Sequence, residues 1–258
     1  QRKLEVARFS QPDAALPWPQ GSAPAPVSSK LEPVLEQAFA EPDPLNLRHT
    51  KAVVVIHKGR LVAEKYAPEV DGNTPLPGWS IAKSVTNLLI GRLMNDGKLS
   101  LTQTAPVAAW YEEISDPRGH ITIDQLLRMS SGLEFDETYG LQSDVAHMLS
   151  VEADAAGFAA SKPLVAEPDT LWAYSSGTSN ILSGVIRLTV GGYMQDYYDF
   201  IQTQLLLPLG IRTASLETDD NGTFVGSSFM YASARDWARL GQFCLQDGWW
   251  QGERLLPE

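Results

Sequence analysis

One β-hairpin followed by a long stretch with few strand signals is the feature that most constrains the fold. Residues 52–56 form a continuous apolar run typical of a buried strand, residues 57–59 a turn, and residues 60–66 a second strand. Helical periodicity dominates from residue 80 onward. Because two strands alone are marginally stable in water, the hairpin needs partner strands. The sequence therefore predicts further strands, supplied either after residue 258 or by another chain.

Seven segments show helical spacing, bounded by turn or capping residues. They cover residues 28–41, 80–96, 122–130, 143–160, 176–190, 193–206 and 233–247. Thr122 is the expected N-cap of the third segment, and Cys244 in the last is expected to be a small core residue. Because Cys244 is the only cysteine, an intrachain disulfide and a cysteine-rich zinc site are excluded. Residues 1–26, rich in Pro, Ala, Gln and Ser, are predicted to be an extended arm that wraps the surface or stays loose.

The formal net charge of -11 argues against nucleic acid or an anionic membrane as a partner, because both require a basic face. No run of 18 apolar residues is present, so no membrane span is expected, and no signal peptide is visible. The first residue is Gln1 rather than Met, which predicts that a preceding segment was removed. The non-Met start and the single cysteine are compatible with export, so a periplasmic or secreted location is one expectation and the cytoplasm is the alternative. The histidines lack ligand spacing, so no metal site is expected.

Ser80 lies three residues before Lys83, at the expected start of the second helical segment. Residues i and i+3 share a helix face, which brings the lysine amine within reach of the serine hydroxyl. The hydroxyl becomes a nucleophile when a neighbouring base takes its proton, and a buried lysine can be that base. Taken alone, the spacing favours a structural alternative, since serine is a common N-cap and lysine a common helix-surface residue.

A second cluster lies just before the helix expected at residue 176. Residues 172–180 are Trp-Ala-Tyr-Ser-Ser-Gly-Thr-Ser-Asn, an aromatic segment that runs into a Ser/Gly-rich turn. The hydroxyl of Tyr174 can point into a cleft from such a corner, and a neighbouring cationic lysine favours its phenolate form. The structural alternative is a packed tyrosine whose hydroxyl is hydrogen-bonded. Tyr174 is therefore a second candidate catalytic residue.

Several motifs in register resemble the serine β-lactamase and penicillin-binding protein superfamily. They are residues 78–86, 96–99, 121–133, 174–176, 208–210 and 234–241. Class C-like serine hydrolases, including esterases and 6-aminohexanoate-dimer hydrolases, are the most similar group. The resemblance implies an α+β, β-lactamase/transpeptidase-like fold over residues 27–258, with an antiparallel sheet flanked by helices and a helical lobe. Residues 27–75 and 230–258 would form the sheet side, and residues 76–229 the mainly helical lobe.

The resemblance also implies the roles of the candidate residues. Ser80 would be the acylated nucleophile, Lys83 would take or relay its proton, and Tyr174 would be the general base and later the acid for the leaving group. The backbone N–H of Ser80 would be one oxyanion-hole donor. The substrate would be a small-molecule amide or ester, and no cofactor is implied. Side chains expected near the substrate are Trp79, Tyr139, Trp172, Ser176 and Phe229. For the four aromatic residues, ordinary core packing is the structural alternative.

Two departures from the family pattern affect these expectations. Ser176 occupies the asparagine position of the family's Tyr-x-Asn motif, which weakens the case for β-lactam recognition and is similar to amide hydrolases and some esterases. The family's Lys-Thr-Gly or His-x-Gly triad, whose strand supplies the second oxyanion N–H, has no match after Tyr174. The resemblance therefore implies a missing C-terminal segment with further strands and a closing helix.

Two alternatives remain beside an amide or ester hydrolase, and a third is disfavoured. A β-lactamase or D-alanyl-D-alanine carboxypeptidase would use the same residues. A non-catalytic binding or sensor module on the same fold is favoured by the missing triad and opposed by the intact Ser80, Lys83 and Tyr174. An α/β-hydrolase is disfavoured, because the Gly-x-Ser-x-Gly elbow is absent and the segment before Ser80 is a loop.

Overall fold

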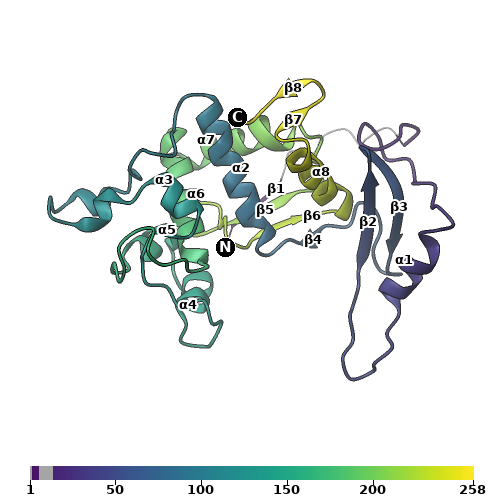
Figure 1. Cartoon of the computed structure of the whole chain (residues 1–258), viewed down its shortest axis with the longest axis horizontal. Helices are drawn as coiled ribbons and strands as arrows, with labels where there is room; N and C mark the ends of the chain where they lie inside the picture. Colours follow the sequence, from purple (N-terminus) through teal and green to yellow (C-terminus); the bar gives the residue numbers. More distant parts are fainter. Residues whose placement is uncertain (1, 6–13) are drawn as a thin grey trace.

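A four-stranded antiparallel sheet lies at the centre of the computed structural model, which describes residues 2–5 and 14–258 (Figure 1). Its strands, in spatial order, are β1 (Arg2–Glu5), β5 (Ser215–Thr218), β6 (Met230–Ala232) and β4 (Leu76–Pro77). Each neighbouring pair is antiparallel. The sheet thus joins segments that lie far apart in the sequence, and β4 leads directly to Ser80.

The predicted hairpin is confirmed as a separate two-stranded sheet, β2 (Ala52–His57) and β3 (Arg60–Tyr66). Its turn has positive φ at both central positions, 50° at Lys58 and 72° at Gly59, which suits the twist of a tight hairpin. The hairpin lies at the opposite end of the molecule from the helical part, with α1 (Glu32–Phe39) beside it (Figure 1). In the described part of the chain, it has no further strand partner.

The helices gather mainly at the other end of the molecule (Figure 1). They are α2 (Ile81–Asn95), α3 (Ile123–Leu127), α4 (Asp144–Ser150), α5 (Ala155–Ala160), α6 (Ser176–Thr189) and α7 (Met194–Ile201). A π-helical turn (Gln202–Leu206) continues α7, and two 3-10 turns lie at Ala108–Tyr111 and Pro117–His120. Helix α8 (Ala234–Leu245) and the short hairpin β7 (Trp249–Trp250) and β8 (Glu253–Arg254) end the chain.

The hydrophobic core is built around α2 and α6, which pack against each other. Apolar positions three and four residues apart on each helix supply its buried face, as amphipathic periodicity requires. Fully or nearly fully buried members include Val85, Leu89, Leu93, Ile181, Val185 and Ile186. This packing fixes the first turn of α2 relative to the first turn of α6, and these are the turns that carry the candidate residues.

Local capping chemistry explains several helix ends. Thr122 is the N-cap of α3 as predicted: its side chain accepts from the Gln125 N–H, and the Gln125 side chain accepts from the Thr122 N–H. Ser175 caps α6 by accepting from the Thr178 N–H at 3.1 Å. Helix α2 ends at Asn95, with Asp96 as its C-cap, and Gly97 follows at φ 69°, the left-handed position that glycine favours.

Several segments differ from the sequence-based expectations. Strands β4 and β5 lie within residues 76–229, and residues 2–5 of the expected arm form β1. The expected helix over residues 143–160 is two helices, because the chain turns after Ser150 and Asp154 caps a new start. These strands have two to four residues and owe their pairing to distant partners, so their sequences carry little signal. Residue 1 and residues 6–13 of the arm lie outside the described residues, and the two-lobe division stays a prediction.

The expectation that Cys244 is a core residue is wrong. Its side chain is exposed, whereas the preceding residue Phe243 is completely buried. Adjacent residues on a helix point about 100° apart, so the helix turns Cys244 outward when Phe243 faces the core.

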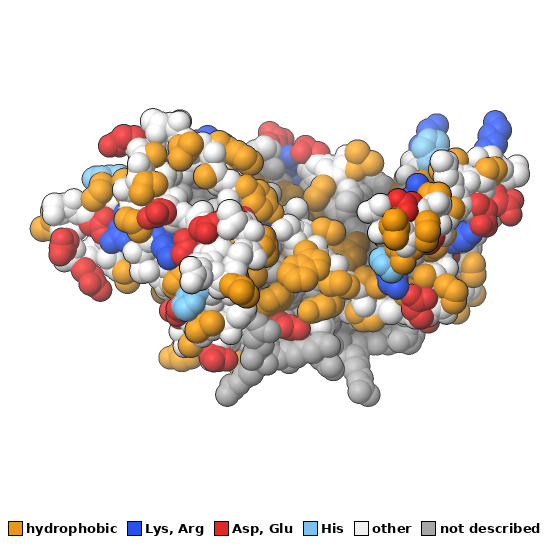
Figure 2. Space-filling model, turned by 90° about the horizontal axis from the view of Figure 1, so that it is seen from below, with side chains coloured by type: hydrophobic (Ala, Val, Ile, Leu, Met, Phe, Trp, Pro, Cys, Tyr) orange, Lys and Arg blue, Asp and Glu red, His pale blue; other side chains and the backbone are white. Residues whose placement is uncertain are grey.

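The surface carries acidic groups without one large acidic patch on the face that Figure 2 shows. Acidic side chains are spread over both ends of this face, and hydrophobic side chains gather near its centre (Figure 2). Within residues 2–5 and 14–258, no helix is both long and apolar enough to cross a membrane.

Candidate active site

A tight turn between β4 and α2 presents Ser80. The Gly78 N–H donates to the Met230 carbonyl at 2.8 Å, which ties the turn to β6. Trp79 adopts φ 44°, a left-handed conformation that is uncommon for a bulky residue. A Cβ atom on Gly78 would lie 2.3 Å from the Trp237 ring, so the backbone packs too closely against α8 for any side chain there. The chain thus turns from strand to helix within two residues and exposes Ser80 at the helix start.

The backbone N–H of Ser80 has no hydrogen-bond partner among the described residues. It belongs to the first turn of α2, where backbone N–H groups have no partner inside the helix. An N–H group on the nucleophile itself lies where negative charge develops on an attacked carbonyl oxygen. This group is therefore free to act as the oxyanion donor that the sequence analysis expects.

Lys83 is half-buried and donates to three oxygen atoms. Its Nζ lies 3.2 Å from Ser80 Oγ, 3.0 Å from Ser176 Oγ and 3.0 Å from the Ser227 carbonyl oxygen. A lysine ammonium has three donors and no acceptor, so these contacts satisfy it completely. The structure therefore brings Ser80, Lys83 and Ser176 together, although Ser176 is 93 residues from Lys83 in the sequence.

The Ser227 carbonyl is held in place from both central helices. Asn180 of α6 accepts from the Ser227 N–H at 3.3 Å and donates to Ser227 Oγ at 3.1 Å. Thr86 of α2 donates to the carbonyl of the neighbouring Gly226 at 3.0 Å. Ser227 was not among the site residues predicted from the sequence, because nothing in the local sequence shows that a loop 144 residues away reaches Lys83.

Glu137 is the second residue that the sequence analysis missed. Its carboxylate accepts two hydrogen bonds from Ser176: the N–H donates to Oε2 at 2.8 Å, and the hydroxyl donates to Oε1 at 2.5 Å. Glu137 lies in the loop between α3 and α4, in a segment without a motif or a regular period. Ser176 is itself completely buried, so this carboxylate is the partner of a buried polar side chain.

Tyr174 lies beside the cluster through its ring. Lys83 Nζ is 4.9 Å from the centroid of the ring, which is within cation–π distance. The Tyr174 side chain is 40% exposed, and within the described residues its hydroxyl makes no hydrogen bond to Ser80 or Lys83. The predicted pairing of Lys83 with Tyr174 is therefore an approach of the amine to the ring face in this structure.

The segment before Tyr174 is anchored to the end of α3. The Asp169 N–H donates to the Ser130 carbonyl at 2.8 Å, and the Ala173 N–H donates to the Met129 carbonyl at 3.0 Å. Hydrogen bonds from Gln125, Ser130 and Arg128 lower the pKa of Asp169 to about 2. An ionised Asp169 therefore holds this connection over the ordinary pH range.

The residues predicted to bind substrate lie at different distances from the cluster. Trp79 is next to Ser80, is 56% exposed and packs against Phe229 with ring centroids 6.3 Å apart. Burial, and after it the charge of Glu137, raises the pKa of Tyr139 above its ordinary value. Trp172 is 67% exposed and has no ring contact with the cluster within the described residues.

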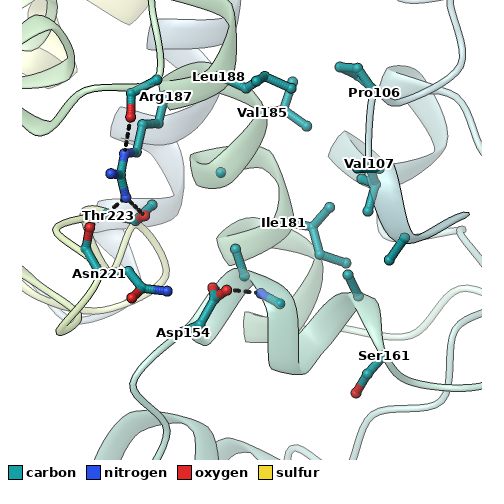
Figure 3. A pocket seen from close by; sticks show the side chains of 17 residues that line it. Pro106, Val107, Asp154, Ser161, Ile181, Val185, Arg187, Leu188, Asn221 and Thr223 are labelled. Atoms are coloured by element: carbon teal, nitrogen blue, oxygen red, sulfur yellow. Dashed lines mark hydrogen bonds between the residues drawn. The ribbon is translucent and has the colours of Figure 1, made fainter.

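A cavity of about 420 Å³ lies elsewhere on α6 (Figure 3). Its walls come from residues 106–109, from α5, and from the later turns of α6, where Ile181, Val185 and Leu188 face it. Its polar groups are engaged in local structure: Asp154 caps α5 through the Gly157 N–H, and Arg187 donates to backbone and side-chain oxygens of its neighbours. None of the predicted site residues lines this cavity, so the cluster around Ser80 and this cavity are separate features.

Metal-binding groups do not cluster in the part of the chain that the structure describes: no three His, Cys, Asp or Glu side chains gather there as a cation site. The polar cluster instead combines a serine hydroxyl, an amine, a carboxylate and backbone groups. This set of groups suits nucleophilic chemistry with proton transfer.

Solved structures with this architecture come from several hydrolases. A protein from Bacillus anthracis described as a 6-aminohexanoate-dimer hydrolase is 23% identical, with a TM-score of 0.69 over 91% of this chain and 66% of its own. EstCE1, a hydrolase with promiscuous acyltransferase activity, is 18% identical, with a TM-score of 0.67 over 88% of this chain and 73% of its own. A D-stereospecific amidohydrolase from Streptomyces sp. is 21% identical, with a TM-score of 0.62 over 90% of this chain and 75% of its own.

These similarities confirm the expected α+β, β-lactamase/transpeptidase-like fold. The chain spans 66% of the length of the Bacillus anthracis protein. The sequence model of the Beta-lactamase family matches residues 46–258, which is most of the chain and includes Ser80, Lys83 and Tyr174. The chain therefore belongs to the Beta-lactamase family, and the predicted resemblance to the serine β-lactamase and penicillin-binding protein superfamily is confirmed.

Proposed function

We propose that the protein is a serine hydrolase that cleaves an amide or an ester through an acyl-enzyme on Ser80. The observation that carries this proposal is the 3.2 Å contact between Lys83 Nζ and Ser80 Oγ, with two further acceptors fixing the amine. A nucleophile and a base within hydrogen-bond reach, with the base oriented by other groups, is the arrangement that covalent catalysis requires.

The proposed reaction has two steps. In the first, Lys83 takes the proton of the Ser80 hydroxyl while Oγ bonds to the substrate carbonyl carbon, and the carbonyl oxygen becomes an oxyanion facing the Ser80 N–H. Tyr174 gives a proton to the departing amine or alcohol as its bond to carbon breaks. In the second step, water attacks the acyl carbon and gives a proton to the Tyr174 phenolate that the first step left. The bond between this carbon and Ser80 Oγ then breaks, Lys83 returns its proton to Oγ, and the carboxylic acid leaves.

The substrate class we favour is a carboxylic ester or a linear amide. Ser176 stands in place of the family's asparagine and is hydrogen-bonded to Lys83 and Glu137, so no amide group is available there for a β-lactam side chain. The exposed aromatic rings of Trp79, next to Ser80 in the chain, and of Tyr174, next to Lys83, suit an apolar group on the substrate. The family membership keeps a β-lactamase or D-alanyl-D-alanine carboxypeptidase as the second candidate.

The decisive experiment is covalent labelling of the purified protein with a fluorophosphonate, read by intact mass. We expect a single adduct that is lost in Ser80→Ala and retained in Ser84→Ala, whose hydroxyl lies on the exposed face of α2. Hydrolysis of p-nitrophenyl butyrate, a 6-aminohexanoate dimer and nitrocefin then ranks ester, amide and β-lactam substrates. A folded protein that forms no adduct at Ser80 would overturn the proposal and favour a non-catalytic binding module.

A further inference from the structure

Glu137 is linked to the amine of Lys83 through one intervening residue, Ser176. It contacts Ser176 twice, and Ser176 in turn accepts from Lys83. We propose that Glu137 is a positioning residue that fixes the direction of the Ser176 hydroxyl and thereby aims Lys83 at Ser80. This inference rests on the proposed hydrolase function and assigns a residue to that same site.

The Ser176 hydroxyl carries a single proton, which can be donated to only one partner. An ionised carboxylate only accepts hydrogen bonds, so a 2.5 Å contact with Glu137 Oε1 commits this proton to the carboxylate. The other carboxylate oxygen accepts from the Ser176 N–H at 2.8 Å, which prevents the carboxylate from rotating away. Only the lone pairs of Ser176 Oγ remain for Lys83, 3.0 Å away.

Lys83 Nζ has three tetrahedral positions besides its bond to Cε. The Ser227 carbonyl can only accept, and Glu137 makes Ser176 Oγ an acceptor as well. Two protons of the amine are therefore committed to these oxygens, and the third position faces Ser80 Oγ at 3.2 Å. In the ammonium form this position holds a proton. In the neutral amine it holds the lone pair, which then points at the serine proton that must be removed.

Without Glu137, the network has a competing arrangement. The Ser176 hydroxyl could then donate to the neutral amine, so the lone pair of Lys83 would face Ser176 and a proton would face Ser80. That arrangement cannot accept the serine proton. Glu137 excludes it through hydrogen-bond direction, since no salt bridge between Glu137 and Lys83 is present in the described residues.

A purely structural role is the competing explanation. The Ser176 N–H belongs to the first turn of α6, and a carboxylate there stabilises a helix by satisfying a free N–H and by its charge. A test must therefore separate the contact with the backbone N–H from the contact with the hydroxyl.

Glu137→Gln is the informative variant, because glutamine has one acceptor oxygen and one donor amide. With its oxygen on the Ser176 N–H, its NH₂ group faces Ser176 Oγ and turns the hydroxyl proton toward Lys83. We expect the rate of Ser80 acylation by p-nitrophenyl butyrate to fall about 10- to 100-fold, with KM nearly unchanged. Glu134→Gln, an exposed glutamate in the same loop, is the matched control and should behave as wild type.

A double-mutant cycle with Ser176→Ala distinguishes the two roles. Ser176→Ala keeps the N–H donor and removes the hydroxyl, so adding Glu137→Gln should lower the acylation rate no further. An equal loss from Glu137→Gln in both backgrounds would show that Glu137 acts through the helix backbone, and would overturn the inference. If Glu137→Gln does not fold, Ser176→Ala alone is decisive, because a wild-type acylation rate in that variant excludes any action through the hydroxyl.

The same measurements separate this inference from the function on which it rests. A wild-type protein without a Ser80-dependent adduct overturns both. A wild-type protein that is acylated at Ser80, together with Glu137→Gln acylated at the same rate, overturns only the role of Glu137.

Discussion

Two polar clusters in this protein each combine a carboxylate with a cation, and their hydrogen bonds are arranged differently. In the first, Arg235 of α8 donates directly to both oxygens of Glu64 on β3, at 2.7 and 2.5 Å. In the second, Ser176 stands between Glu137 and Lys83. The first cluster joins the hairpin to the rest of the protein, and the second surrounds Ser80.

The difference lies in the groups to which the hydrogen bonds of each cluster are directed. Tyr66 also donates to Glu64, so the carboxylate in the hairpin cluster has a partner on both oxygens, and its side chain is only 8% exposed. Although burial opposes its ionisation, hydrogen bonds from Arg235 and Tyr66 hold the pKa of Glu64 below its ordinary value. Both oxygens of Glu64 are therefore hydrogen-bonded within the cluster, which suits a structural role. In the Ser80 cluster, one position of Lys83 is directed at the Ser80 hydroxyl, and under the proposed function this is the position that takes the serine proton.

The largest effect is expected on the labelling rate of Ser80 when the amine of Lys83 is removed. Lys83→Ala should lower the rate of fluorophosphonate labelling at Ser80 by about 10²- to 10⁴-fold, the usual contribution of a general base. The free energy of unfolding should stay close to the wild-type value. Lys98→Ala, an exposed lysine just after α2, is the control. Unchanged labelling of Lys83→Ala would remove the lysine from the mechanism.

The second largest effect is expected in the cluster of Glu64 and Arg235. It should change the stability of the protein and leave the activity unchanged. Glu64→Gln leaves Arg235 as a buried charge without its partner, which should lower the free energy of unfolding by about 3–5 kcal/mol in urea titrations. The labelling rate of the folded protein should stay near wild type. Glu69→Gln, in an exposed pair with Lys51, should cost far less. A strong loss of labelling in folded Glu64→Gln would show that the two clusters are coupled.

A smaller effect is expected at the turn that lies between the two clusters. Gly78→Ala places a methyl group against the Trp237 ring of α8, and overpacking of this kind costs about 1–3 kcal/mol. Because the turn presents Ser80, labelling should slow as well. Gly241→Ala, where a Cβ meets no atom within 4 Å, is the matched control for a thermal melt. If Gly78→Ala melts and labels as wild type does, the close packing does not position the serine.

The smallest effect is a change in the pH dependence of stability. The pKa of Glu64 is lower in the folded protein than its ordinary value of 4.5, so its contribution is complete above that value and is lost as the pH falls through the folded pKa. The difference in unfolding free energy between wild type and Glu64→Gln should therefore narrow between about pH 6 and about pH 3. A difference that stays constant over this range would mean that the ionised carboxylate is not what stabilises the hairpin.

Local features of the fold were predictable because their causes lie within a few residues. The hairpin at residues 52–66, the Thr122 cap and the helix after Ser80 each depend on neighbours in the sequence, and the structure confirms all three. The short strands β4, β5 and β6 were not foreseen, since a strand of two to four residues is defined by the partner that it meets.

The candidate site divides in the same way. The proximity of Ser80 and Lys83 follows from the sequence alone, because one helical turn places residues i and i+3 on the same face whatever the rest of the chain does. The acceptors that fix the amine, and the carboxylate that orients Ser176, come from positions 39 to 144 residues away from their partners. Only the packing of α2 against α6 and the closure of the loops around them decide those contacts, since no local spacing encodes them.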